Sequence, residues 1–322
     1  MRLKQQPTAL ATAAILAVSL LTGASAQASA PQQKSQAPGY YRLMLGDFEV
    51  TALSDGTFPM EASKLLTNIT PKQLEGALHR VFLKEPVDAS VNAFLINTGS
   101  KLVLIDTGAG ILFGPSVGKL LGNLKAAGYE PGQVDEIYIT HMHGDHVGGL
   151  VVDSKAAFPN ATVRAGQADA DFWLSKAKMD AAPKEQKDSF QGAMASLNPY
   201  VAAGRFKPIT ADGELVPGVR AQAAAGHTPG HTVYVIESKG QKLLIWGDLM
   251  HVAAAQFPDP KVTIRFDSDS PAAAAQRKKI FAEAAASGEW VAGAHLSFPG
   301  IGHLRATGTG YTFVPANYSV PH

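Results

Sequence analysis

Four side chains that commonly bind metal ions lie within six consecutive residues. They are His141, His143, Asp145 and His146, in the segment Thr140-His141-Met142-His143-Gly144-Asp145-His146. The chain has ten histidines, so three in six residues is a marked concentration. Neutral imidazole and carboxylate suit zinc and similar divalent ions. In an extended backbone His141, His143 and Asp145 point to one side and His146 projects differently. The segment therefore predicts ligands for two neighbouring metal centres.

Three later positions can complete such a site. They are His227 in Gly226-His227-Thr228-Pro229-Gly230-His231, Asp248 in Trp246-Gly247-Asp248-Leu249, and His295 in Gly293-Ala294-His295-Leu296. Taken singly, each is more typical of an ordinary core or surface residue. Together with the first cluster they supply enough ligands for two metal sites. Because the chain has no cysteine, every ligand must be nitrogen or oxygen.

The ligands follow segments that are predicted to be strands. Short apolar runs that indicate strands are Val91 to Ile96, Leu102 to Ile105, Val134 to Ile139, Thr232 to Ile236 and Leu243 to Trp246. The spacing of Val117, Leu120, Leu121 and Leu124 predicts a helix between Pro115 and Gly128, and Ser270-Pro271 begins a second helix that runs to about Ala286. Mixed strands and helices with no dividing linker predict a single α/β domain built as a layered sandwich.

The motifs resemble those of the metallo-β-lactamase superfamily. The resemblance covers His-x-His-x-Asp-His, Gly-His-Thr-Pro-Gly-His, Gly-Asp and a late His, in that order, and Asp106-Thr107-Gly108 resembles the superfamily's early Asp-Thr-Gly turn. Further segments resemble the methyl parathion hydrolase branch, which includes exported organophosphate hydrolases and related lactone and aryl-ester hydrolases. These are Pro38 to Tyr41, Leu45 to Phe48, Thr51 to Gly56 and His295 to His303. The resemblance implies an αββα sandwich over residues 39–322.

The resemblance also implies a two-metal site. One centre would use His141, His143, His227 and Asp248, and the other would use Asp145, His146, Asp248 and His295. Asp248 would then be both the bridging ligand and the catalytic residue that accepts the proton of a shared water. Asp106 and His231 would orient ligands. The implied cofactors are two divalent ions, Zn²⁺ by preference, which lower the pKa of water and polarise a carbonyl or phosphoryl oxygen.

The substrate class depends on the walls of the cleft. The resemblance places Phe113, Trp173, Phe190 and Phe266 around the cleft, although ordinary core packing explains any one of them equally well. Leu65, His251, Ile264 and Phe266 stand where dedicated organophosphate hydrolases of the branch carry Arg, Leu, Thr and Leu. We therefore expect a hydrolase of lactones or aryl esters, with phosphotriester hydrolysis as the alternative.

Other classes of protein have weaker support. A penicillin-hydrolysing role is disfavoured because several true β-lactamases of the superfamily have a cysteine ligand that this chain lacks. A glutathione-thioester hydrolase needs a basic patch that the motifs do not supply. An oxygen or nitric-oxide reductase of this fold typically has Glu where His143 stands. A metal-binding protein without catalysis stays open, and a turnover assay distinguishes it.

The N-terminus predicts export. Arg2 and Lys4 precede an apolar run from Ala9 to Leu21, and Ala24-Ser25-Ala26 is a signal of cleavage, so residues 1–26 are interpreted as a signal peptide and 27–38 as a flexible lead-in. The run is shorter than the roughly 20 apolar residues of a spanning helix, which disfavours a membrane anchor. Cleavage takes the formal net charge from +1 to −1, so the whole chain has no preference for nucleic acid. We expect a periplasmic or secreted protein, with a homodimer as one candidate assembly.

Overall fold

The computed structural model describes residues 30–320, so the predicted signal peptide and the start of the lead-in lie outside the described residues. Residues 30–38 are exposed and form no helix or strand. From Ala37 onward the described chain forms one compact unit by its internal contacts. In this described part, no helix combines the length and the apolar character that crossing a membrane requires. The predicted domain boundaries stay predictions.

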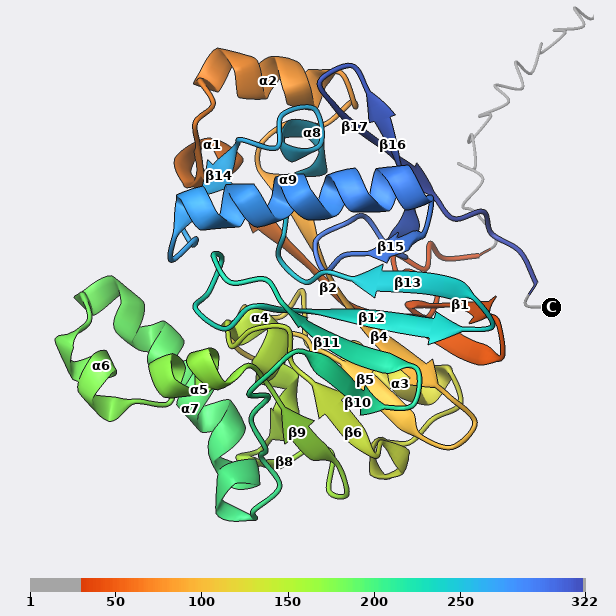
Figure 1. Ribbon diagram of the computed structural model, residues 1–322, viewed down its shortest axis with the longest axis vertical. Helices are drawn as coiled ribbons and strands as arrows, with labels where there is room; N and C mark the ends of the chain where they lie inside the picture. Colours follow the sequence, from red (N-terminus) through yellow and green to blue (C-terminus); the bar gives the residue numbers. More distant parts are fainter. Residues whose placement is uncertain (1–29, 321–322) are drawn as a thin grey trace, which may run out of the picture. The chain divides into compact units, whose positions relative to one another are not determined.

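Two β-sheets form the centre of this unit (Figure 1). The first has the order β1 (Tyr40–Leu45), β2 (Phe48–Met60), β4 (Val87–Asn97), β5 (Leu102–Ile105), β6 (Glu136–Tyr138) and β9 (Thr162–Arg164). The second has the order β10 (Gly213–Val216), β11 (Val219–Ala223), β12 (Thr232–Ser238), β13 (Gln241–Ile245), β15 (Trp290–Ala292), β16 (Ile301–Thr307) and β17 (Gly310–Pro315). Most neighbours are antiparallel, but β5–β6, β6–β9 and β13–β15 are parallel pairs.

The strands are apolar on both faces because both faces are covered. In β4, Phe94 and Ile96 pack with residues of the second sheet, whereas Ala93 and Leu95 pack with the helices outside the first sheet. Such a strand has a nearly continuous apolar sequence, since successive side chains point to opposite faces. This burial explains why the apolar run in the sequence is enough to predict the strand β4.

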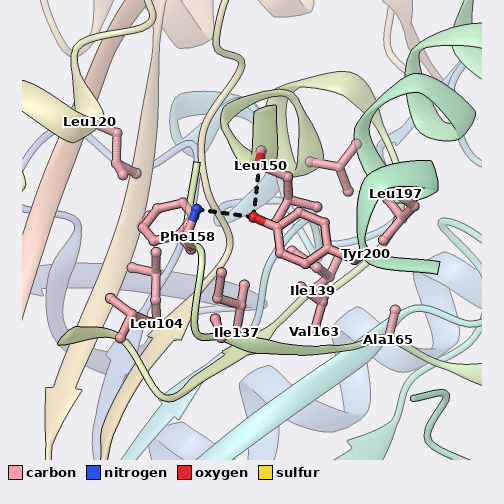
Figure 2. Close-up of a cluster of buried hydrophobic side chains, with 14 of the residues drawn as sticks. Leu104, Leu120, Ile137, Ile139, Leu150, Phe158, Val163, Ala165, Leu197 and Tyr200 are labelled. Carbon is pink, nitrogen blue, oxygen red and sulfur yellow. Dashed lines mark hydrogen bonds between the residues drawn. The ribbon is translucent and has the colours of Figure 1, made fainter. Parts of the chain in front are cut away.

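Helices form the two outer layers. The first sheet is covered by α3 (Leu120–Ala126), α4 (Gly144–Val147), α5 (Gln167–Trp173) and α7 (Lys184–Ala202), with α6 (Lys176–Ala181) beside them. Figure 2 shows part of this core, in which the Tyr200 hydroxyl of α7 donates to the Leu150 carbonyl and accepts from the Phe158 N–H. The second sheet is covered by α8 (Ala253–Gln256) and α9 (Ser270–Ser287). The layers confirm the predicted αββα sandwich.

The remaining short elements lie in the connections. A small apolar cluster joins α1 (Ala62–Leu65), α2 (Pro71–His79) and the two-stranded pair of β3 (Leu66–Thr67) with β14 (Thr263–Ile264). The others are η1 (Pro131–Gln133), η2 (Gly148–Leu150), β7 (Val151–Val152) and β8 (Lys155–Ala156).

The predicted elements are present, with some shifted ends. The helix α3 begins at Leu120 rather than near Pro115, because Gly118 has a φ of +78° and its N–H donates to the buried Asp55 carboxylate. The helix α9 begins where predicted, since the Asp269 side chain accepts the Ala272 N–H, and it ends at Gly288 in the left-handed conformation.

Candidate metal centre

The candidate ligands come from loops at one edge of the two sheets. Asp106 follows β5, His141 to His146 follow β6, His227 and His231 lie in the turn between β11 and β12, Asp248 follows β13, and His295 follows β15. Paired strands of the two sheets end there, so residues more than 150 positions apart in sequence come together. These side chains are buried, apart from a partly exposed His143.

Three imidazoles converge in the first ligand group, which consists of His141, His143, His227 and Asp248. The Nδ1 atom of His143 lies 3.0 Å from Nε2 of His141 and 3.1 Å from Nε2 of His227. Nitrogen ligands about 2.0–2.1 Å from a tetrahedral zinc lie about 3.3 Å from one another. The spacing therefore fits a single divalent ion.

The second ligand group consists of Asp145, His146 and His295, with Asp248 beside it. Nε2 of His146 lies 3.6 Å from Oδ2 of Asp145 and 3.3 Å from Oδ1 of Asp248. A helical turn begins at Gly144, so Asp145 does not follow the extended alternation that would have placed it with His141 and His143. This geometry places Asp145 with His146 and His295.

Asp248 lies between the two groups. Its Oδ2 atom lies 3.6 Å from Nε2 of His141 and 3.4 Å from Nε2 of His227, and its Oδ1 atom faces His146. Oδ1 of Asp248 and Nε2 of His146 are both buried without a hydrogen-bond partner among the described residues. Unsatisfied buried polar atoms that face each other in this way are costly unless a further group joins them. The residues present thus fit two divalent ions.

Hydrogen bonds to Nδ1, the ring nitrogen that points away from the ligand groups, fix the orientation of three histidine rings. His146 Nδ1 donates to Oδ2 of Asp106 over 2.8 Å. His227 Nδ1 donates to Oδ1 of Asp267 over 2.9 Å, and His295 Nδ1 donates to the Ser90 carbonyl over 2.8 Å. Each donation leaves the lone pair on Nε2, which faces the ligand groups.

Asp106 supports the metal loop from behind. Its carboxylate accepts the backbone N–H and the hydroxyl of Thr140, each over 2.8 Å, and its φ is +60°. Thr107 donates both its N–H and its hydroxyl to the His146 carbonyl. The structure therefore places Asp106 in contact with the ligand loop.

His231 contacts Asp248 through the backbone. Its Nε2 atom accepts the N–H of Asp248 over 3.1 Å. Gly247 has a φ of +53°, and a Cβ there would lie 2.9 Å from Nε2 of His231, so the close approach requires glycine. Burial lowers the pKa of His231 to about 3, which keeps the ring neutral and able to accept this hydrogen bond.

Two supporting carboxylates did not stand out in the sequence. Asp169, in α5, accepts the Met142 N–H, the Thr228 hydroxyl and the Gly230 N–H, and so joins the two histidine-bearing loops. Asp267 binds His227 and also accepts the Ile264 N–H. Neither residue lies in a recognisable motif, since their partners are distant in sequence.

The electrostatics suit cation binding. Burial, with a smaller contribution from neighbouring imidazoles, holds the pKa of His141 and His143 well below 6.5. Burial alone would raise the pKa of Asp248, but the surrounding histidines hold it well below its usual value. Burial would lower the pKa of His227, yet hydrogen bonds to Asp248 and Asp267 raise it to about 9. Neutral imidazoles and an ionised carboxylate therefore coexist, and an ion must displace protons from part of the site.

The residues expected to line the cleft separate into two groups. Phe113 and Phe266 are about half exposed, Leu65 is half-buried, and Trp173 is buried, with its ring edge-on to that of His143 at 5.2 Å. In contrast, Phe190 and Ile264 are fully buried. Phe190 packs behind Trp173, and Ile264 belongs to the cluster of α1, α2 and β14. These two residues therefore belong to the core and offer no surface to a substrate.

We expected His251 to line the substrate cleft, but it lies in contact with a candidate metal ligand. Its Nε2 atom lies 3.0 Å from Oδ2 of Asp248, and its ring stacks on His295 at 5.1 Å. Burial lowers its pKa to about 4. Geometrically, Asp248, His251 and His295 form a third group of potential ligands.

Known proteins resemble this chain over most of the described fold. The structure of the hydrolase AbOPH, in the beta lactamase superfamily, is 39% identical with a TM-score of 0.85, and the match covers 89% of this chain and 100% of that one. The structure of AidC, a dizinc quorum-quenching lactonase in complex with the product N-hexanoyl-L-homoserine, is 29% identical with a TM-score of 0.81 over 88% and 99% of the two chains.

Curated relatives match a shorter part of the sequence. An N-acyl homoserine lactonase of Bacillus sp. is 28% identical over 174 residues, which are 48% of this chain and 61% of the relative. The chain spans less than two thirds of the length of the first such relatives. Residues 87–295 match the family described as the metallo-beta-lactamase superfamily, and this range includes all seven candidate ligands. With the αββα layers and the two ligand groups, this match shows that the chain belongs to the metallo-β-lactamase superfamily.

Proposed function

We propose that the protein is a two-metal hydrolase that opens lactones. The observation that carries the proposal is the position of Asp248, whose buried carboxylate contacts both ligand groups: Oδ1 faces Nε2 of His146, and Oδ2 faces Nε2 of His227 and of His295. The similarity to a dizinc lactonase over almost the whole chain supports this substrate class. Aryl esters are a second class of substrate that the same chemistry would serve.

The side chains prepare the site in three ways. His141, His143 and His227 would hold one ion, and Asp145, His146 and His295 the other, with Asp248 shared. When bound, two such ions supply Lewis-acid chemistry, because they polarise a carbonyl oxygen and lower the pKa of water. Asp106 and Asp267 hold the histidine rings in position, so little reorganisation is needed during the reaction.

The walls favour an apolar substrate with a flat reacting carbon. Phe113 and Phe266 expose aromatic surface, and Trp173 lies against His143. A lactone carbonyl is planar, whereas a phosphotriester has two further alkoxy groups that need lateral room. His251 and Phe266, whose ring centroids are 6.4 Å apart, occupy space beside Asp248. We therefore rank lactones above phosphotriesters.

Hydrolysis of a substrate panel tests the proposal. Zinc-loaded protein would be assayed with N-acyl homoserine lactones, simple aromatic lactones, aryl esters and methyl parathion, with metal-stripped protein as the control. We expect the highest kcat/KM for a lactone and loss of activity on stripping. A preference for methyl parathion over every lactone would favour the phosphotriesterase alternative. Two bound ions without turnover of any substrate would indicate a metal-binding protein.

A further inference from the structure

His251 differs from the candidate ligands in its hydrogen bonding. His146, His227 and His295 each have an acceptor for the proton on Nδ1, so Nε2 has the free lone pair. The Nδ1 atom of His251 is buried and has no hydrogen-bond partner among residues 30–320. The two kinds of histidine therefore need not have the same tautomer.

The missing partner at Nδ1 and the nearby Asp248 carboxylate together favour one tautomer of His251. If Nε2 bound a metal ion, the proton would be on Nδ1, where a buried N–H would have no acceptor. Buried N–H groups without an acceptor are rare in proteins, because each loses its hydrogen bond to water, although Nδ1 of His231 is one in this structure. If Nε2 has the proton instead, Oδ2 of Asp248 accepts it at 3.0 Å. Hydrogen bonds to a carboxylate are among the stronger ones in proteins.

We infer that His251 is a positioning residue that donates its Nε2–H to Oδ2 of Asp248 and is not a metal ligand. Of the four imidazoles near Oδ2, His251 is the closest, and the other distances are 3.2, 3.4 and 3.6 Å. The donation restrains rotation of the Asp248 carboxylate, so that Oδ1 stays directed to His146 and Oδ2 to His227. The inference rests on the two-metal assignment of the proposed function.

A buried polar network holds His251 in this position. The side-chain carbonyl of Gln256 accepts the N–H of His251 over 2.7 Å and that of Val252 over 2.9 Å. The Gln256 amide donates to the Val262 carbonyl, which also accepts from Arg277. Arg277 donates in addition to the carbonyls of Leu249 and Pro260.

Burial of two polar side chains costs free energy, which indicates that the network has a role in positioning His251. Gln256 and Arg277 are both fully buried. Carbonyl groups accept from Nε and Nη1 of this guanidinium, whereas its buried Nη2 has no hydrogen-bond partner among the described residues. These carbonyls belong to the segment 249–262, which contains His251, so the network fixes the backbone on both sides of that residue.

The tautomer can be measured directly. Zinc-loaded protein with ¹⁵N-labelled histidine would be examined by long-range ¹H–¹⁵N correlation, and His251→Gln would identify the His251 signals by their loss. We expect a proton on Nε2 of His251 and an unprotonated, metal-free Nδ1. An Nε2 atom without a proton and with the shift of a zinc ligand would overturn the inference.

Two variants test the donor role independently of the tautomer. His251→Gln keeps an N–H donor near the former Nε2 position, whereas His251→Leu removes it at similar volume. Zinc competition with a chelator should show about 10–100-fold weaker affinity for the Leu variant, as for other groups that orient ligands, with most of the affinity retained in the Gln variant. Both variants should still bind two ions per chain. Equal weakening of both, or none in the Leu variant, contradicts the proposal.

Thermal unfolding of the metal-free variants controls for misfolding, because a general loss of structure would lower the Tm of both. Neither the spectrum nor the zinc titration requires a substrate. The tautomer assignment can therefore fail while lactone hydrolysis is observed, and it can hold for a protein that hydrolyses none of the substrate panel.

Discussion

The Nδ1 atom of His227 donates to Oδ1 of Asp267 over 2.9 Å, which directs Nε2 of His227 towards Asp248. Asp267→Ala should therefore weaken zinc binding by about 10–100-fold, as loss of a partner behind a ligand typically does. Chelator competition measures the affinity. Asp269→Ala is the matched control, because this nearby carboxylate caps α9 and contacts no ligand. The control should lose about 1 kcal/mol of stability and keep its zinc affinity. Equal zinc affinities in the two variants would refute the assigned role.

Removal of the shared ligand should affect both ions. Elemental analysis of the wild type should find about two divalent ions per chain. Asp248→Ala should lower the affinity of both sites and abolish turnover, whereas Asp145→Ala should mainly empty the site of His146 and His295. Wild-type protein with at most one ion under metal-replete conditions would rule out the two-metal arrangement.

Acid should destabilise the metal-free protein through His231. Its folded pKa of about 3 lies below the ordinary histidine value of 6.5, so the unfolded state binds more protons between these two pH values. Stability is therefore present above pH 6.5 and falls as the pH falls, by about 2 kcal/mol between pH 7 and pH 5. His231→Gln keeps an acceptor for the Asp248 N–H but does not titrate. Urea unfolding at several pH values should show a smaller acid loss in this variant, and identical profiles would argue against buried neutral His231.

The walls beside Asp248 should decide substrate choice. Replacement of His251 and Phe266 by Leu should shift the ratio of the two kcat/KM values towards methyl parathion and away from lactones. One change in an apolar pocket is worth about 1–3 kcal/mol of discrimination, or roughly 10–200-fold. Both constants would be measured at saturating zinc. Phe82→Leu, at a fully exposed aromatic residue, should leave the ratio unchanged. A ratio in the double variant equal to that of the wild type would show that other residues set specificity.

Export should remove the predicted signal peptide. If cleavage follows Ala26, the recovered protein begins at Gln27. Intact-mass measurement of protein from the periplasm or the medium tests this expectation. A full-length cytoplasmic product would mean that the N-terminal segment has another role.

The sequence by itself determined the layers and the set of candidate ligands. The strand β4 and the helix α9 were evident because burial on two faces and helix capping leave local patterns in the sequence. The candidate ligands stood out because His141 to His146 lie close together in one loop, and His227, Asp248 and His295 lie in short glycine-containing turns. Local spacing is enough for such features, since each depends on neighbouring residues.

Only the tertiary structure decided which atoms face one another. Asp267 and Asp169 support the histidine loops through contacts across 27 to 61 positions, so no local motif indicated them. Phe190, for which core packing was an equal expectation, is buried, and so is Ile264, while His251 lies against Asp248; the last two were expected at the cleft surface. Side chains of these types occur both in the buried interior and at the surface of a cleft. Their positions depend on how the loops pack over the sheet ends, and packing between distant segments leaves no periodic pattern in the sequence.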